Sequence, residues 1–441
     1  MINQKQLRKK LESVSLEDIA QATNFTKRND GKITPLNFVL SFFISIQNTS
    51  HTLGSWAAEL AILVRKTFSY NGMKYAQNQS RVFFAKKLLQ SVIDQQLKKS
   101  PKPKIGTRLL EKFKRVFVAD STCINLPAFL YKFFPGPFNR YGKSATAKIQ
   151  LCVELKSGNY TNLDLQSFTD NDQKFSPNIL KHLLPGDLII RDLGFWALWV
   201  LQKIIHKKAF FISRLRFGTN LYKIENGDQI DLPKMLRKAR RNAQSVVELQ
   251  ACVGKEAQVQ GRIVAIKCPI GITRKRRKAA RNNRHSKANH SKDYLELLGW
   301  TLFFTNVSQT TLSAQELLEV YGYRWRIEII FKCWKTHFKI DRLFDTQTKL
   351  TKQQVEIAFY LFLVWLTLFF VRMYNFFLHE IYAKKQKLLS LMKFAKFVKE
   401  HLSDLLADSD LDFWINHLAY YCTYKKRNDR LNFCQQLYLF I

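Results

Sequence analysis

The spacing of apolar residues changes along the chain and predicts helices at both ends. Up to about residue 97 the apolar positions follow helical spacing, and Pro35 opens a long apolar segment (PLNFVLSFFISI) that suits a helix start. A stretch rich in Lys and Pro at 98–106 (KKSPKPKIG) indicates a linker. We therefore predict a helical N-terminal domain with its linker at 1–105, and a helical, aromatic C-terminal region at 346–441.

Short apolar runs between these ends predict strands. RVFVAD at 115–120 and DLIIRD at 187–192 are patterns of buried strands that end in an acid, and 148–170 has the pattern of a hairpin. A helical stretch at 195–207 precedes a further strand, AFFISRL, at 209–215. Strands that alternate with helices predict an α/β fold, and the order of three strands, a crossover and further strands fits a ribonuclease-H-like core.

The segment at about 216–307 differs from its surroundings, because strand-like pieces flank a basic run at 273–287 (TRKRRKAARNNRHSK). We expect an inserted β subdomain here, within a central domain at 106–345. Seven of the eleven residues at 274–284 are Lys or Arg. This run can be a solvated loop, a contact to the phosphate backbone of DNA, or both. The candidate contacts are Arg274, Lys275, Arg276 and Arg277.

The charge balance narrows the choice of partner. The chain has 441 residues and is 46% hydrophobic, which is enough for a folded core, but 71 Lys and Arg against 34 Asp and Glu give a net charge of +37. Such a protein attracts polyanions, of which nucleic acid is the usual one and an anionic membrane surface the weaker alternative.

Compartment and membrane signals favour the cytoplasm. Seven cysteines occur without a CxxC motif, which argues against a zinc site and a disulfide framework, and the first twenty residues lack the apolar core of a secretion signal. The segment Ile357–Val371 is apolar except for Thr367. Its fifteen residues are fewer than the roughly 18 to 20 that a bilayer needs, so we interpret it as a buried core helix and expect no membrane partner.

Two acids stand directly after apolar strands. Asp120 ends RVFVAD, and Asp192 ends LIIRD. Acids at the carboxyl ends of strands project into the crevice where open α/β sheets bind their ligands, and an unpaired carboxylate is costly to bury. Taken singly, either acid could be a helix cap or a turn residue.

A third acid lies in the segment at 321–335 (YGYRWRIEIIFKCWK). If the segment is one helix, Tyr321, Arg324, Glu328 and Lys335 fall within roughly 60° of one another on one face. A carboxylate can bind a hard cation there, while Arg, Lys and a phenol hold phosphate oxygens. The alternative is an amphipathic surface helix with incidental charge pairs.

The pattern Tyr-x2-Arg-x3-Glu-x6-Lys resembles the signature of the DDE transposases of the fourth insertion-sequence family, in particular its cut-and-paste members. Asp120 is followed by Ser121 and Thr122, as the first acid of that family is by a small residue and Thr. The second acid of the family opens an Asp-Arg-Gly-aromatic turn, and here Leu193 stands in place of the Arg. A large β insertion before the glutamate is also a feature of the family, and the resemblance spans roughly residues 110–345.

The resemblance implies a site with two Mg²⁺ ions, for which Mn²⁺ can substitute. The metal ligands and catalytic residues would be Asp120, Asp192 and Glu328. Arg324 and Lys335 resemble the phosphate clamps of the family and Tyr321 a hydroxyl donor to the DNA backbone. Lys332, one turn after Glu328, adds a cation on nearly the same face.

Two tryptophans complete the candidate DNA contacts. Trp300 precedes Glu328 by 28 residues, and cut-and-paste members of the family carry a tryptophan at this place that stacks on a base flipped out of the DNA end. Trp325 either supports the same pocket or packs in the core.

These features predict the transposase of a prokaryotic insertion sequence. It would bind the terminal inverted repeats of its element, cleave the DNA through hairpin ends, and join the 3′ ends to target DNA. We expect a cytoplasmic, nucleoid-associated protein that forms a dimer on paired ends. The first alternative is a catalytically silent DNA-binding repressor or inhibitor derived from a transposase, and the second is a membrane-associated basic protein.

Overall fold

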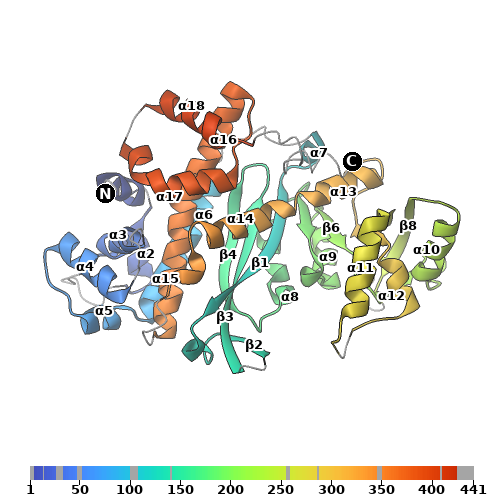
Figure 1. Ribbon diagram of the computed structural model, residues 1–441, viewed down its shortest axis with the longest axis horizontal. Coiled ribbons are helices and arrows are strands. Elements are labelled where there is room, and N and C mark those ends of the chain that lie inside the picture. The colour runs from blue at the N-terminus through green and yellow to red at the C-terminus, as the bar shows by residue number, and fades with distance from the viewer. Residues whose placement is uncertain are drawn as a thin grey trace. The chain divides into compact units, whose positions relative to one another are not determined.

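A computed structural model of the chain describes residues 4–12, 14–25, 33–46, 52–99, 108–139, 142–254, 259–285, 288–344, 350–407 and 410–424. It is a mixed α/β structure with two compact units (Figure 1). Unit 1 comprises 1–105, 121–170 and 326–428, and unit 2 comprises 106–120, 171–325 and 429–441. The chain passes from one unit to the other within strand β1 (Val116–Leu126), and again at the start of helix α14 (Trp325–Thr336).

Unit 1 is mainly helical. Its N-terminal helices are α1 (Gln4–Glu12), α2 (Leu16–Ala22), α3 (Pro35–Ser45), α4 (Leu53–Val64), α5 (Tyr70–Ala76) and α6 (Gln79–Lys99). Pro35 stands in the first turn of α3, where its missing N–H costs no hydrogen bond, and Thr34 caps that helix by accepting from the Asn37 N–H. The predicted helical N-terminal segment is thus confirmed as helical, whereas residues 100–106 of the predicted linker lie outside the described residues.

Three strands of unit 1 pair antiparallel at one end of the sheet. β3 (Gly142–Glu154) pairs with β2 (Pro135–Asn139) through residues 142–145 and with β4 (Asn159–Ser167) through residues 147–154. β3 and β4 form the hairpin predicted at 148–170. Ten successive residues of β3 are buried, and four of them, Thr146, Lys148, Gln150 and Glu154, are polar or charged.

One long helix crosses the core of unit 1. α15 (Lys352–Trp365), the π-helical η5 (Leu366–Val371) and α16 (Arg372–Lys385) follow one another without a break, and α15 packs against α3 and α6. Within the described residues this is the one helix long and apolar enough to cross a membrane by length and composition, so the argument from the shortness of 357–371 was wrong. Its most apolar window is 94% buried, which is the environment expected of a core helix. Helices α17 (Leu391–Ala407) and α18 (Leu411–Tyr421) complete the unit.

Unit 2 holds a sheet that begins with the first half of β1. β1, β5 (Leu188–Arg191) and β6 (Phe210–Arg214) are parallel neighbours, and α9 (Leu198–His206) makes the crossover from β5 to β6. Antiparallel strands continue from β6 in the order β10 (Trp300–Thr305), β9 (Val259–Lys267), β8 (Val246–Val253) and β7 (Leu221–Tyr222). The strands expected in an insertion at 216–307 therefore extend this sheet by backbone pairing with β6.

Helices of unit 2 lie partly where the sequence suggested loops. The basic run forms most of α11 (Ile270–Asn282), so the interpretation as a loop was wrong. Arg, Lys and Ala are strong helix formers, and Pro269 precedes the first turn, where a proline breaks no hydrogen bond. Two further helices, α10 (Leu232–Arg241) and α12 (Lys292–Leu297), lie in the same part of the chain, and α13 (Ala314–Gly322) follows β10.

Candidate active site

Asp120 and Asp192 occupy corresponding positions on two neighbouring strands. The parallel register of β1 and β5 pairs Ala119 with Arg191, so the next residue of each strand is an aspartate. Adjacent strands lie about 4.8 Å apart, and residues level with each other in parallel strands project from the same face. Strand register therefore brings the two carboxylates together, because both apolar runs end at the same level of the sheet.

Each aspartate accepts a hydrogen bond from the segment that contains the sequence signature. Arg324 Nη1 donates to Asp120 Oδ2 at 3.0 Å, and the Tyr321 hydroxyl donates to Asp192 Oδ1 at 3.2 Å. The side chains of Arg324 and Asp120 are only 13% and 20% exposed, so water screens this ion pair weakly. Burial, and after it the charge of Asp192, raises the pKa of Tyr321, which keeps its hydroxyl protonated as a donor.

The signature is not one continuous helix, and that prediction was wrong. α13 ends at Gly322 and α14 begins at Trp325, with a tight turn between them in which the Arg324 N–H bonds to the Tyr321 carbonyl at 3.0 Å. Glycine has a low helix propensity, which favours a break here. The turn lets Tyr321 and Arg324 reach the ends of two different strands.

Glu328, Lys332 and Lys335 do lie on one stripe of a helix, because they follow one another by four and three residues in α14. Glu328 is half-buried in the first turn and the two lysines are exposed, with Lys335 in the last turn. An acid near the start and a cation near the end both suit the helix dipole. These three residues belong to unit 1, whereas Asp120, Asp192, Tyr321 and Arg324 belong to unit 2.

Arg214 is a site residue that the sequence reasoning missed. It lies at the end of β6, where burial lowers its pKa and the negative charge of Asp192 opposes that shift. Its buried Nε has no hydrogen-bond partner, and its guanidinium forms no salt bridge with any described residue. The segment AFFISRL could have indicated it. Arg214 follows an apolar run as Asp120 and Asp192 do, and a charge held at the end of a buried strand is costly unless it has a function.

The donor types at the two aspartates fit a hard cation such as Mg²⁺, which prefers carboxylate oxygens. Within the described part of the chain, however, no group of three His, Cys, Asp or Glu side chains is close enough to hold a metal ion. Two of the predicted ligands, Asp120 and Asp192, are in unit 2, and the third, Glu328, is in unit 1.

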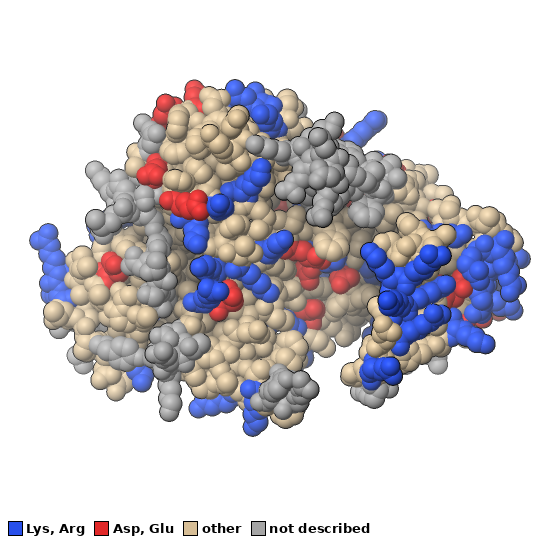
Figure 2. Space-filling view, viewed as in Figure 1, with Lys and Arg blue, Asp and Glu red and all other residues tan. Residues whose placement is uncertain are grey.

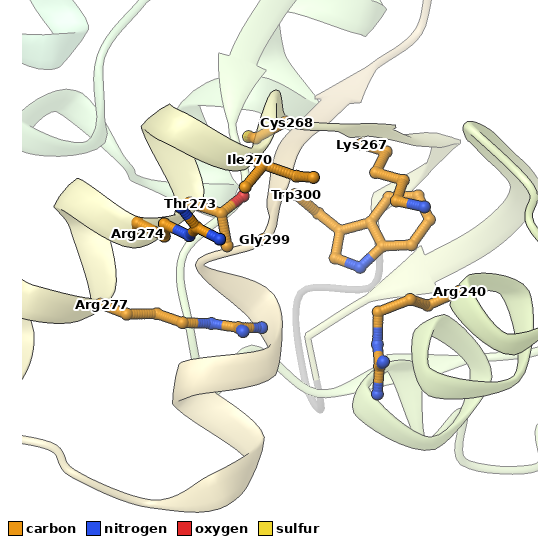
Figure 3. Close-up of a pocket in the computed structure, with 9 residues that line it drawn as sticks. All are labelled: Arg240, Lys267, Cys268, Ile270, Thr273, Arg274, Arg277, Gly299 and Trp300. Carbon is orange, nitrogen blue, oxygen red and sulfur yellow. The ribbon is translucent and has the colours of Figure 1, made fainter.

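Trp300 lines a basic pocket in unit 2 (Figure 3). The pocket has a volume of about 220 Å³, and its cations come from three elements: Arg240 of α10, Lys267 of β9, and Arg274 and Arg277 of α11. Figure 3 shows Arg277 reaching from α11 into the space below the indole, whereas Arg240 of α10 turns its guanidinium away from the ring. Trp300 is only 2% exposed, and no sequence pattern indicated Arg240 or Lys267 as its neighbours.

Trp325 and the basic run have other surroundings than expected. Trp325 is 54% exposed and does not line the Trp300 pocket, so its interpretation as a core residue was wrong. The Arg324 guanidinium lies 5.8 Å from the centre of its ring. In the basic run, Arg274 and Lys275 are exposed, whereas Arg276 and Arg277 are partly buried and donate hydrogen bonds to their own chain.

Comparisons with known proteins agree with the geometry. The family model described as Transposase DDE domain matches residues 111–359, more than half of the chain. The transposase for insertion sequence element IS231F of Bacillus thuringiensis subsp. israelensis is 27% identical over 408 residues, which cover 88% of this chain and 83% of that protein. The transposase for insertion sequence element IS1151 of Clostridium perfringens is 25% identical over 363 residues, covering 77% and 74%.

A solved structure, the piggyBac transposase synaptic complex with hairpin DNA, covers 95% of this chain and 84% of that chain with a TM-score of 0.40 and 9% identity. A likeness this weak carries no argument.

The chain belongs to the DDE transposases, since the match to that domain covers more than half of the chain and runs from before Asp120 into α15. Its relatives within the class are transposases of insertion sequences, which confirms the prediction of the fourth insertion-sequence family. DDE transposases are DNA-cutting and DNA-joining enzymes that use divalent metal ions.

Proposed function

We propose that this chain is an active transposase of a prokaryotic insertion sequence, which binds the terminal inverted repeats of its element, cleaves the DNA by phosphoryl transfer and joins the 3′ ends to target DNA. The observation that carries the proposal is the pairing of two strand-end aspartates with Arg324 and Tyr321, beside the unpaired Arg214. Carboxylates for metal and cations for phosphate are the two parts that phosphoryl transfer needs.

The catalytic roles follow from the chemistry of each side chain. Asp120, Asp192 and Glu328 would hold two Mg²⁺ ions, or Mn²⁺ in their place, which when bound stabilise the attacking and leaving oxygens. Arg324 and Lys335 bind phosphate oxygens, and the protonated Tyr321 hydroxyl donates a hydrogen bond to the DNA backbone.

Two further cations extend this set. Arg214 adds a charge that is already desolvated, so it can pair with a phosphate at little further cost. Lys332 extends the stripe that begins at Glu328.

The pocket at Trp300 supports a hairpin step. A tightly bent DNA end requires an extruded base, and stacking on an indole stabilises such a base by about 1 to 3 kcal/mol. Lys267 and Arg274 would neutralise the phosphates on either side of it. We assign Trp325, which is exposed beside Arg324, to the DNA surface rather than to this pocket.

The remaining parts of the proposal concern assembly. Residues 1–105 would form a DNA-binding domain, 106–345 a ribonuclease-H-like catalytic domain with its insertion at about 216–307, and 346–441 a helical C-terminal region. The basic residues Arg274 to Arg277 lie next to the DNA path in this scheme. The protein would act in the cytoplasm on the nucleoid, as a dimer when two ends are paired, and without a membrane partner.

A cleavage assay tests the catalytic assignment. Asp120→Asn, Asp192→Asn and Glu328→Gln should each abolish Mg²⁺-dependent nicking of a duplex that carries the element end, while binding of that duplex changes little. Asp228→Asn, in an exposed loop of unit 2, and Glu319→Gln, in α13, are isosteric controls that should cleave normally. Nicking at the wild-type rate by any of the three variants would refute the triad. A wild-type protein that binds ends but never cleaves them would favour the silent repressor.

A further inference from the structure

Three helices of unit 2 carry an unusual concentration of charge (Figure 2). α10 has the sequence LPKMLRKARR and buries only Leu232, Leu236 and Ala239. α11 has the sequence IGITRKRRKAARN and buries no residue at all. A helix without a buried face cannot be held by apolar packing alone, so other contacts must fix α11 in place.

The acids of α12 link the two basic helices. Arg237 and Arg240 of α10 form salt bridges with Asp293 at 2.5 Å and Glu296 at 2.9 Å. The two arginines are three residues apart in α10, as the two acids are in α12, so the salt bridges lie one helical turn apart along both helices. From α11, Arg277 donates to the Leu295 carbonyl at 2.8 Å and lies 3.9 Å from Glu296.

Arg276 secures the other side of α11, because its Nη1 donates to the Trp300 carbonyl at 3.3 Å and to the Cys268 sulfur at 3.0 Å. Two arginines of α11 and two of α10 are thus used within the protein. They hold the helices and are not free to bind a partner.

The other cations of both helices have no such role. Lys234, Lys238 and Arg241 of α10 and Arg274, Lys278 and Arg281 of α11 are exposed, and none has a side-chain hydrogen bond or salt bridge to another described residue. On each helix the three follow one another by four and three residues, which places them in one row. The row on α10 lies roughly 90° from the arginines that pair with α12.

We propose that these two rows bind the phosphate backbone of duplex DNA, with α12 as the acidic support that holds both helices in position. That the bound polyanion is DNA rests on the proposed transposase function. Seven residues of helix span about 10 Å, and phosphates of one strand of B-DNA recur every 3.4 Å along its axis. Each row therefore matches about three phosphates. Such contacts position the duplex and carry no sequence information of their own.

One matched pair of variants on α10 separates the two kinds of cation. Lys238→Gln removes an unpaired charge, and Arg237→Gln removes the adjacent paired one. Binding to a duplex without the element end is measured between about 50 and 200 mM salt. Lys238→Gln should reduce the slope of log affinity against log salt by about 1 and leave thermal unfolding unchanged. Arg237→Gln should lower the unfolding temperature and leave the slope nearly as in the wild type.

The combined variant Lys234→Gln, Lys238→Gln and Arg241→Gln should reduce the slope by about 3. The control is a triple variant of unit 1 with the same loss of charge, and it should change the slope by less than 1. It combines Lys387→Gln, Lys396→Gln and Lys399→Gln. An equal change in both triple variants, or none in the α10 variant, would overturn the proposal. The proposal would also be overturned if the α10 variant lost binding to anionic phospholipid vesicles while its slope of log DNA affinity against log salt stayed normal.

Cleavage by the wild-type protein keeps the two proposals distinct. If the wild type cleaves element ends but the α10 variant keeps its salt slope, the DNA surface is refuted and the transposase assignment stands. If the wild type never cleaves but the α10 slope changes as expected, the catalytic assignment fails and the DNA surface stands.

Discussion

Arg214 should be a residue that catalysis needs and stability does not. Its guanidinium is desolvated at the end of β6, and its buried Nε has no hydrogen-bond partner. A methionine has a similar length and no charge to bury. Arg214→Met should therefore make the folded protein more stable and the enzyme much slower.

The magnitudes follow from the surroundings of the side chain. Replacing buried ionic groups by apolar ones of similar size stabilises proteins by about 1 to 4 kcal/mol. Attraction to Asp192 offsets part of the desolvation cost of Arg214, so we expect the low end, about 1 kcal/mol. Loss of one preorganised charge at a reacting phosphate should slow cleavage by roughly 10² to 10³.

A second buried arginine provides the control. Arg262 donates to Glu248 at 2.7 Å and to the Leu312 carbonyl at 2.6 Å, and it is 2% exposed. Arg262→Met leaves these acceptors unpaired and should destabilise the fold by about 3 to 5 kcal/mol. Thermal unfolding and nicking of an end-containing duplex are measured on both variants. A loss of stability in Arg214→Met as large as in Arg262→Met, or cleavage at the wild-type rate, would show that Arg214 is a structural residue.

Other substitutions separate binding from chemistry. Trp300→Phe keeps most of the buried volume, whereas Trp300→Ala would cost about 3 to 5 kcal/mol of stability. The Phe variant should nick the first strand and yield about tenfold less hairpin on denaturing gels, and a normal hairpin yield would make Trp300 a core residue. Arg324→Ala and Lys335→Ala should impair cleavage more than binding; equal, large losses of affinity for any duplex would assign them to the general binding surface. Affinity of the wild type for DNA should fall steeply from about 50 to 200 mM salt, and a flat response would exclude DNA as the partner.

Some features follow from local sequence, because they depend on residues close together in the chain. The apolar runs before Asp120 and Asp192 gave the positions of β1 and β5, since an uninterrupted apolar run fits a strand buried on both faces. The spacing of Glu328 and Lys335 gave their common stripe on α14. The signature itself identified the family, which the comparisons confirm.

Tertiary structure decided the partners of these residues. Register between β1 and β5 set the two aspartates level, and the turn after α13 sent Tyr321 and Arg324 to different acids. The same basic run that suggested a loop is a helix whose arginines divide into those bound by α12 or β10 and those left exposed. Residues 56 positions apart, such as Arg240 and Glu296, leave no mark of their pairing in a single sequence. Local sequence determines the periodicity of each element and the charges it carries. The pairing of those charges is set by the packing of segments that are distant in the chain.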